Sequence, residues 1–377
     1  MRLLLMFLLM FGIAPCLPAQ SAGEHTHPGL GRPIEFPDIP GYQTLKCDFH
    51  IHTVFSDGNV WPTIRVEEAI RDGLDALALT EHLEYQPHAA DIPHPDRNRS
   101  FQLARDFAEA YDILVVHGAE ITRDMPPGHS NAIFIQDANA LLIDDPVEVF
   151  REANRQGAFT FWNHPNWTAQ KPDGITELTD LHRQLIDEDL LHGIEVVNQF
   201  TYSAEALQVA QENNLAIMGT SDIHGLIDWD YAVHAGEHRP ITLVFATEKT
   251  EAAIKEAMEA RRTVAWFNNT LIGNSEVLQP LIEASLSVAS AEYPDNNTVL
   301  QVELENTSDA HFLLQSTTSL TFHEHADIVE VAPHSTQLLQ VKTGEVLASF
   351  ELGFRVLNAV TAPGQHPEWR VTVRPGN

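Results

Sequence analysis

Histidine and acidic side chains recur in seven short groups in the first two thirds of the chain, most of them at the end of a short apolar run or in the loop that follows it. In Asp-Phe-His-Ile-His-Thr, residues 48–53, His50 and His52 are two positions apart, so in a strand they share one face and can bind one ion. The other groups are Ser-Asp-Gly at 56–58, Thr-Glu-His at 80–82, Gly-Ala-Glu at 118–120, Gly-His-Ser-Asn at 128–131, Asn-His-Pro at 163–165 and Ser-Asp-Ile-His-Gly at 221–225. Imidazole and carboxylate without thiolate suit Zn, Mn or Fe.

The elements that must position these groups alternate along residues 42–272. Apolar runs of strand length occupy 46–52, 74–80, 113–122, 131–135, 158–162, 193–197, 215–220 and 241–246. Helix-like segments lie between them at 62–72, 98–111, 146–156, 204–213 and 250–261. Repeated strand–helix units predict an α/β fold of parallel strands covered by helices, as a barrel or an open sheet.

In a β/α barrel the carboxyl ends of the strands face one rim, so the ionisable groups would meet there. One histidine after a strand is more often a packing residue than a ligand. Many charges gathered at one rim would repel each other and resist desolvation unless cations neutralised them. The pattern therefore predicts a metal centre.

The ordered motifs resemble those of the polymerase and histidinol phosphatase (PHP) superfamily over about residues 45–265. The resemblance implies a distorted (β/α)7 TIM-like barrel that binds two to three divalent metal ions, Mn, Zn or Fe. It implies that one residue, Glu120, bridges two metals. The implied ligands are His50, His52, Glu120 and Asp222 for the first metal, Glu120, His129 and His164 for the second, and Asp57, His82 and His224 for the third.

This ligand set predicts hydrolysis of a phosphoester. A water held between two cations loses a proton near neutral pH and becomes a nucleophile, and a further metal stabilises charge on the phosphoryl oxygens. We expect attack by a metal-bridging hydroxide, with Glu120, Asp222 and Arg123 as catalytic residues. The sequence contains no G-x-S-x-G elbow or phosphate-binding P-loop that would indicate another mechanism.

Three basic or aromatic side chains are candidates for substrate contacts. Arg123 follows Glu120 by three positions and can bind a phosphate oxygen with two hydrogen bonds, or pair instead with a local acid such as Asp124. His238 and Arg239 lie in a later loop and are candidates for lining the pocket.

Other residues beside the motifs have supporting roles in this reading. Glu81, next to His82, can orient a ligand. Trp162, Trp167 and Trp229 flank the motifs and can form an apolar wall for an ester group or pack under the loops.

The pattern changes after the barrel segment. Residues 273–377 contain short alternating runs of strand length, which predict a small C-terminal all-β domain, a sandwich. Its histidines, His311, His323, His325 and His334, show no metal-binding spacing.

The N-terminus predicts export. Residues 1–20 form a signal peptide, with a basic start and an apolar stretch too short to span a bilayer, and 21–41 form an extended lead-in that contains His25 and His27. If Cys16 is removed with the signal peptide, Cys47 is the remaining cysteine and forms no internal disulfide. We expect a periplasmic or extracellular bacterial protein.

The charge balance limits the partners. With 22 Lys and Arg against 53 Asp and Glu, the formal net charge is −31, which disfavours binding to nucleic acid or to an anionic membrane. We expect a small phosphorylated substrate and no membrane insertion of the mature chain, and the oligomeric state is open.

The combination of signal peptide, barrel and β domain resembles the exported Sb-PDE family phosphodiesterases. This resemblance implies a phosphodiesterase for small organophosphate diesters. The alternatives are a phosphomonoesterase of the histidinol-phosphatase type and, from a different class, a metal-carrying binding protein without catalytic activity.

Overall fold

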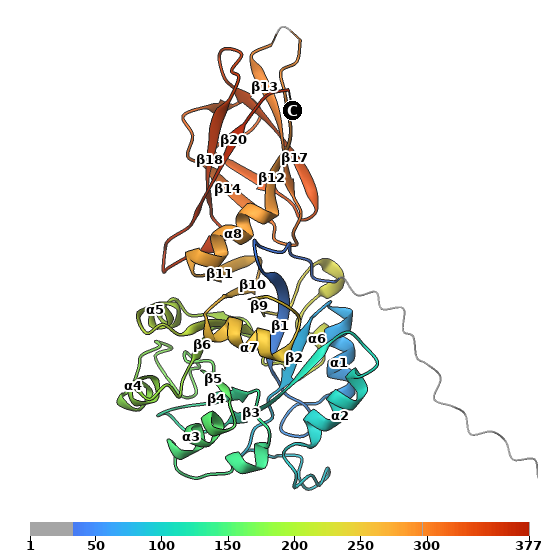
Figure 1. Cartoon of the computed structure of the whole chain (residues 1–377), viewed down its shortest axis with the longest axis vertical. Coiled ribbons are helices and arrows are strands. Elements are labelled where there is room, and N and C mark those ends of the chain that lie inside the picture. Colours follow the sequence, from blue (N-terminus) through green and yellow to red (C-terminus); the bar gives the residue numbers. More distant parts are fainter. Residues whose placement is uncertain (1–32, 296, 377) are drawn as a thin grey trace, which may run out of the picture. The chain divides into compact units, whose positions relative to one another are not determined.

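The computed structural model describes residues 33–295 and 297–376 (Figure 1). The predicted signal peptide, His25 and His27 lie outside the described residues. Within residues 33–41 of the predicted lead-in there is no helix, and Ile34 and Ile39 are buried. No helix in the described part of the chain is long and apolar enough to cross a membrane.

One twelve-stranded sheet curls to form the barrel domain. Its strands follow the order β19-β11-β10-β9-β1-β2-β3-β4-β5-β6-β7, and β8 pairs with β6. The strands are β1 (Gln43–Ile51), β2 (Ala76–Leu79), β3 (Leu114–Ile121), β4 (Ser130–Ile133), β5 (Phe159–Trp162), β6 (Gly193–Asn198), β7 (Thr201–Tyr202), β8 (Ala216–Thr220), β9 (Ile241–Ala246), β10 (Thr263–Phe267), β11 (Thr270–Gly273) and β19 (Ala359–Val360).

The predicted α/β barrel class is confirmed, but the sheet is only partly parallel, whereas the strand–helix alternation predicted parallel strands. β1, β2 and β3 are parallel, as are β5, β6 and β8. β4 is antiparallel to β3 and β5, and β9 and β10 run antiparallel to their neighbours. Asn268 and Asn269, with φ values of 43° and 61°, form the two-residue turn from β10 to β11, and so short a turn can join only antiparallel strands.

The helices of the barrel domain lie around the outside of the sheet (Figure 1). They are α1 (Pro62–Arg71), α2 (Arg99–Ala108), α3 (Glu148–Arg155), α4 (Asp180–Asp187), α5 (Ala204–Glu212), α6 (Ile227–Asp230) and α7 (Glu251–Glu259). Local sequence explains several of the starts: Pro62 opens α1, and the side chains of Thr179, Ser203 and Thr250 accept a backbone hydrogen bond at the first turns of α4, α5 and α7.

The C-terminal region is a β-sandwich that follows helix α8 (Ser275–Ser285), an element that the sequence pattern did not predict. One sheet has the order β12-β13-β17-β15 and the other β16-β14-β18-β20. The strands are β12 (Leu286–Glu292), β13 (Val299–Asn306), β14 (Phe312–Ser316), β15 (Thr321–Phe322), β16 (Ile328–Val331), β17 (Ser335–Lys342), β18 (Phe350–Val356) and β20 (Glu368–Val373). Their pairing is antiparallel, and buried Phe312, Phe354 and Trp369 contribute to the core, so the prediction of an all-β domain is confirmed.

The sandwich also contributes to the sheet of the barrel domain. The short strand β19 leaves the sandwich sequence and pairs in parallel with β11, Leu271 opposite Ala359. Nearby, the side chain of Asn358 donates hydrogen bonds to the carbonyls of Asn269 and His311, both at 2.9 Å. The Asn269 side chain in turn accepts from the backbone N–H of His311.

Candidate metal centre

All nine predicted ligands meet at one rim of the barrel, formed by the carboxyl ends of the parallel strands and the amino end of antiparallel β4. The elements that carry them are β1, β3, the loops after β1, β2 and β5, the segment before β4 and the segment after β8. Three sets of these side chains bring ligand atoms within 4.8 Å of one another: His52, Asp57, His82 and His224; His50, His52 and Glu120; and His82, Glu120 and His129.

The ligand cluster has two halves. The carboxylate of Glu120, at the end of β3, is the centre of the more buried one, the Glu120 half. This half also contains His50, His52, His129, His164 and Asp222, and the Asp57 half contains Asp57, His82 and His224. The Glu120 carboxylate is fully buried, and five imidazoles surround it. The distances from a Glu120 oxygen to the nearest nitrogen are 3.6 Å for His50, 3.6 Å for His52, 2.6 Å for His82, 3.1 Å for His129 and 3.6 Å for His164. A carboxylate in this position has an oxygen available for each of two cations.

Asp222 completes the buried half from the segment after β8. Its Oδ1 lies 3.2 Å from His50 Nε2 and 3.1 Å from His52 Nε2. Its backbone N–H donates to the carbonyl of His50, and His52 N–H donates to the carbonyl of Ile223. Backbone hydrogen bonds therefore join the end of β1 to the segment after β8 at the position of the ligands.

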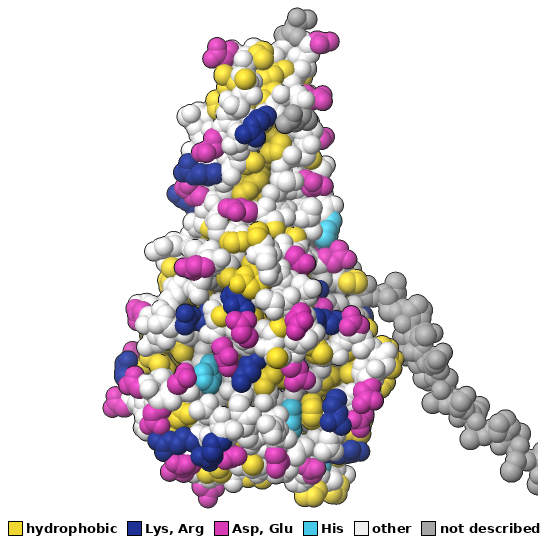
Figure 2. Space-filling view, in the orientation of Figure 1, with side chains coloured by type: hydrophobic (Ala, Val, Ile, Leu, Met, Phe, Trp, Pro, Cys, Tyr) yellow, Lys and Arg dark blue, Asp and Glu magenta, His cyan; other side chains and the backbone are white. Residues whose placement is uncertain are grey.

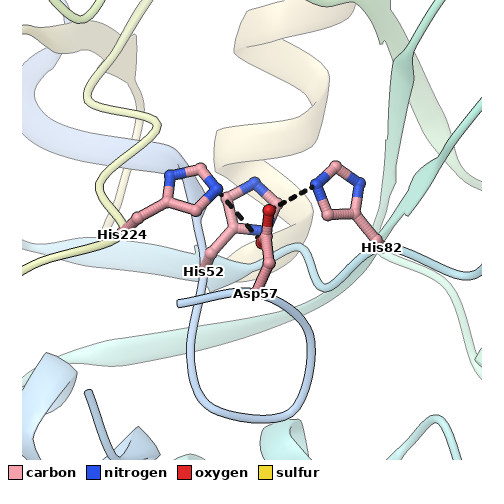
Figure 3. Close-up of side chains that lie close together, drawn as sticks. All are labelled: His52, Asp57, His82 and His224. Carbon is pink, nitrogen blue, oxygen red and sulfur yellow. Dashed lines mark ion pairs between the residues drawn. The ribbon is translucent and has the colours of Figure 1, made fainter. Parts of the chain in front are cut away.

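The second half of the cluster is centred on Asp57, which lies between His224 and His82 (Figure 3), and it is partly exposed. His224 Nε2 lies 3.1 Å from Asp57 Oδ1, and His82 Nε2 lies 3.5 Å from Oδ2. The Asp57 side chain is 23% exposed and that of His224 is 31% exposed. Gly58 lets this loop fold tightly, because a Cβ there would lie 2.8 Å from the backbone of His52.

Glu195 is a functional residue that the sequence reading missed. It lies in β6, is 1% exposed, and accepts hydrogen bonds from His50 Nδ1 at 2.7 Å and from the backbone N–H of His164 at 2.6 Å. Asn198 donates to Glu195 and, at 3.2 Å, to Asp222 Oδ2. The signal was an acidic residue in the middle of the apolar run Gly-Ile-Glu-Val-Val-Asn, because a buried carboxylate needs partners.

Arg65 was also missed, because it lies in helix α1 and not beside a motif. Its guanidinium is completely buried and donates to the backbone carbonyls of His52, Ile223, His224 and Gly225. It also forms an ion pair of 2.7 Å with Glu68. Arg65 therefore connects the two backbone segments that carry His52 and His224.

Glu81 supports the cluster indirectly. Its carboxylate accepts hydrogen bonds from the backbone N–H and hydroxyl of Thr53 and from the hydroxyl of Ser56. Ser56 in turn lies 3.2 Å from His52 Nδ1. Glu81 therefore acts on the ligand His52 through Ser56.

Two of the ligands have strained backbones. The φ values of His164 and Asp222 are 28° and 47°, a region that costs a non-glycine residue about 1–3 kcal/mol. Backbone hydrogen bonds to Glu195 and to the carbonyl of His50 hold the two residues there. Strain of this kind is typical of positions that are fixed for function.

The charges in the cluster influence one another strongly. Burial alone would raise the pKa of the Glu120 carboxyl, but the imidazoles of His82 and His50 hold it well below its ordinary value. Burial alone would lower the pKa of His82, but Glu120 raises it to about 10. Burial and the neighbouring His224 lower the pKa of His52 to about 3. The carboxylates thus favour positive charge among the imidazoles, a preference that divalent cations satisfy.

The donor atoms fit divalent metals. Glu120 Oε2, Asp57 Oδ1 and His164 Nδ1 are buried and have no hydrogen-bond partner. His50 Nε2 and His52 Nε2 lie 3.0 Å apart, and one proton at most can lie between them. Several oxygen and nitrogen atoms thus converge in a small space, and some of them have no hydrogen-bond partner, as a metal site requires.

The predicted substrate contacts lie apart from the ligands or are engaged elsewhere. Arg123 forms an ion pair with Glu84 at 2.5 Å and donates to the carbonyl of Ile143, so its acidic partner is not Asp124. His238 stacks on Trp266, with 3.3 Å between the ring centroids.

The prediction that Arg239 lines the substrate pocket is wrong. Its side chain is 0% exposed and is paired with Asp72 at 2.7 Å and with Asp48 at 3.4 Å. A side chain so deeply buried cannot contact a soluble substrate in this structure. It supports the β1 side of the barrel, because Asp48 also accepts hydrogen bonds from the backbone and the side chain of Ser221.

The three tryptophans that the sequence placed beside the motifs differ in exposure. Trp162 is 1% exposed and stacks on His182 at 3.9 Å, so it is a packing residue. Trp167 and Trp229 are 45% and 69% exposed. Trp167 contacts the ligand His164, with 5.2 Å between the ring centroids.

Comparison with known proteins identifies the class. A solved structure from Bacteroides vulgatus ATCC 8482, described as a two-domain protein that contains a predicted PHP-like metal-dependent phosphoesterase, is 43% identical, with a TM-score of 0.85. The match covers 91% of this chain and 99% of that chain. The chain therefore belongs to the family of this PHP-like metal-dependent phosphoesterase.

Other matches are partial. A family model described as an Ig-like domain matches residues 286–372, which identifies the sandwich. An uncharacterized protein of Methanocaldococcus jannaschii is 33% identical over 85 residues, and this match spans only 36% of its length. A metal-dependent phosphoesterase structure from Bifidobacterium adolescentis is 19% identical, covering 48% of this chain and 87% of that chain, with a TM-score of 0.37.

Proposed function

We propose that this PHP-like phosphoesterase is a phosphodiesterase that hydrolyses small organophosphate diesters with two to three bound Mn, Zn or Fe ions. The observation that carries the proposal is the position of Glu120, a buried carboxylate with five imidazoles at 3.6 Å or less. This arrangement supports two cations that share one carboxylate. In the reaction, the oxygen of water bonds to phosphorus, one ester P–O bond breaks, and the alcohol leaves with a proton.

The side chains of the protein have separate tasks. His50, His52, Glu120 and Asp222 would hold one metal, His129 and His164 the neighbouring one, and Asp57, His82 and His224 a third. The metals supply Lewis acidity, which activates water and stabilises negative charge on the phosphoryl group. Glu195 fixes the orientation of His50, because it accepts from Nδ1 and leaves Nε2 pointing into the cluster.

The ion pairs that three arginine side chains form within the protein favour a diester substrate over a monoester. A phosphomonoester is largely a dianion near neutral pH and gains from a free guanidinium, whereas a diester carries one negative charge. The guanidinium groups of Arg65, Arg123 and Arg239 each form an ion pair with a carboxylate of the protein. On the face in Figure 2, acidic side chains are spread over the surface, which suits a substrate of low charge.

The test combines metal analysis with two substrates. We expect two to three metals per chain and faster hydrolysis of bis(p-nitrophenyl) phosphate than of p-nitrophenyl phosphate. Glu120→Gln should lose metal and lower both activities by more than about 100-fold, which exceeds the usual effect of a residue outside the ligand shell. Glu303→Gln, a change on β13 of the sandwich, is the control and should leave both unchanged.

Two results would contradict the proposal in different ways. A preference for the monoester would keep the metal centre and replace the diesterase by a phosphomonoesterase. A metal-loaded protein that cleaves neither substrate would favour a metal-carrying binding protein.

We also propose that the protein is exported. The support is the apolar segment after Met1-Arg2 in residues 1–20. N-terminal sequencing of the protein recovered from the periplasm or medium should show that cleavage has occurred near residue 20. An intact N-terminus on protein confined to the cytoplasm would refute export.

A further inference from the structure

Three exposed aromatic side chains stand beside the ligand histidines. Tyr85 is 52% exposed, Trp167 45% and Trp229 69%. Tyr85 and Trp167 come from the loops after β2 and β5, which also supply His82 and His164, and Trp229 lies in the short helix α6, which follows the segment that supplies His224. Large aromatic side chains that stay exposed at the edge of a site are a common means of binding the apolar parts of a ligand.

Two of these rings contact the ligands directly. The ring of Tyr85 lies 5.8 Å from that of His82 at an interplanar angle of 72°. The ring of Trp167 lies 5.2 Å from that of His164 and 5.7 Å from that of His129. Each therefore packs one edge or face against the metal centre and leaves about half of its surface to solvent.

Trp229 packs on the backbone that follows the ligand His224. Its ring lies over the backbone of Gly225, so close that a Cβ at Gly225 would be 2.9 Å from Trp229 Cε3. Gly225 directly follows the ligand His224. Tyr85 and Trp167 thus contact ligand rings, and Trp229 lies beside the residue that follows a third ligand.

We propose that Tyr85, Trp167 and Trp229 bind planar aromatic ester groups of the phosphodiester substrate, an inference that rests on the proposed diesterase function. The metals would bind the charged phosphoryl group, and the rings would stack on the groups that flank it. Planar aromatic groups occur in aryl esters and in nucleosides, and both can stack on an exposed tryptophan.

The experiment holds the leaving group constant. The substrates are bis(p-nitrophenyl) phosphate, methyl p-nitrophenyl phosphate and thymidine 5′-p-nitrophenyl phosphate, all of which release p-nitrophenolate. Differences between them therefore report on the ester group that remains. For each variant, the ratio of kcat/KM for the aryl substrate to that for the methyl substrate is compared with the wild-type ratio, so intrinsic reactivity cancels.

Trp167→Ala should lower the ratio about tenfold, and Tyr85→Ala and Trp229→Ala should lower it less, because stacked rings contribute in this range. Trp167→Phe should restore most of the ratio. Tyr111→Ala is the matched control, since Tyr111 is 48% exposed but packs on Phe107 at the opposite end of the strands. Metal per chain, measured for every variant, should stay at the wild-type value.

The possible results distinguish a failure of the aromatic binding role from a failure of the proposed diesterase function. Loss with the thymidine substrate as well would assign a nucleoside ester, and loss with the aryl substrate alone an aryl ester. Diester hydrolysis with ratios that the three alanine variants leave unchanged, or that Tyr111→Ala changes equally, would overturn the inference and leave the diesterase. Absence of hydrolysis in metal-loaded wild type would overturn both.

Discussion

The two halves of the ligand cluster are held in place by different means. The Glu120 half is largely buried, and its ligands His50 and Asp222 are held by the buried side chains of Glu195 and Asn198. The Asp57 half lies on a loop, is partly exposed, and is held mainly through its backbone by Arg65. The ligands of the first half are therefore positioned by side chains of the barrel sheet. Those of the second half lie on loops whose backbone is fixed by Arg65 of helix α1.

The largest expected difference between the halves is in metal content. Glu120→Gln should remove at least two metals per chain, because this carboxylate touches ligands of both halves. Asp57→Asn should remove one metal and leave the buried half loaded. Elemental analysis of the purified variants measures both. Equal losses in the two variants would show that the halves are not separate sites.

A second test addresses the buried half alone. Glu195→Gln should lower metal affinity or activity by about 10–100-fold, the usual effect of removing a carboxylate that orients a histidine ligand. Competition with a chelator measures the affinity, and the metals of the buried half should be released at lower chelator concentration than in wild type. If only the metal of the Asp57 half were weakened, the role of Glu195 would be refuted.

A third test addresses the exposed half through Arg65. Arg65→Met should destabilise the protein by about 3–5 kcal/mol, because it leaves Glu68 buried without its partner. Arg239→Met is the matched control, since it breaks a comparable buried pair with Asp72. Urea unfolding should give similar losses for both. Chelator titration should show a weakened Asp57 half only for Arg65→Met, and equal titrations would remove the positioning role.

The smallest expected effect concerns acid stability and lies outside the cluster. Burial lowers the pKa of His182 and of His117 to about 4. The unfolded chain therefore binds more protons than the native one between about pH 6.5 and 4, so stability is complete above this window and is lost as pH falls through it. Each histidine contributes at most about 3 kcal/mol.

His182→Gln tests this effect. Gln does not titrate and can still accept from Thr179 in the capping box at the start of α4. The free energy of unfolding should fall less between pH 6.5 and 4 in the variant than in wild type. Parallel pH curves for the two proteins would contradict the lowered pKa of His182.

Much of the site could be predicted because its ligands occupy repeated positions. His50, Glu120 and Asp222 each follow or end an apolar run, and the ends of neighbouring strands must share a rim. Their partners could not be found this way. Arg65 occupies an ordinary helical position with Glu68 three residues on, which reads as a surface pair, and only the tertiary fold buries it.

The fold class was predictable and the strand directions were not. Alternating apolar runs and helices give the same pattern for parallel and antiparallel strands of similar length, and β10 and β11 were not recognised as strands. Helix α8 was missed because Pro280 lies inside it, and proline usually ends a helix. The turn between β10 and β11 contains no glycine, so only the two residues Asn268 and Asn269 indicate a hairpin in the sequence.

The pairing of β19 with β11 bears on how the barrel can be cut from the whole protein. β11 lies next to the end of the large sheet, and β19 satisfies its outer backbone groups. A chain truncated after residue 285 would leave β11 as an unprotected edge strand, and such edges pair with other molecules. The isolated barrel should therefore self-associate, so catalytic studies need the full two-domain chain.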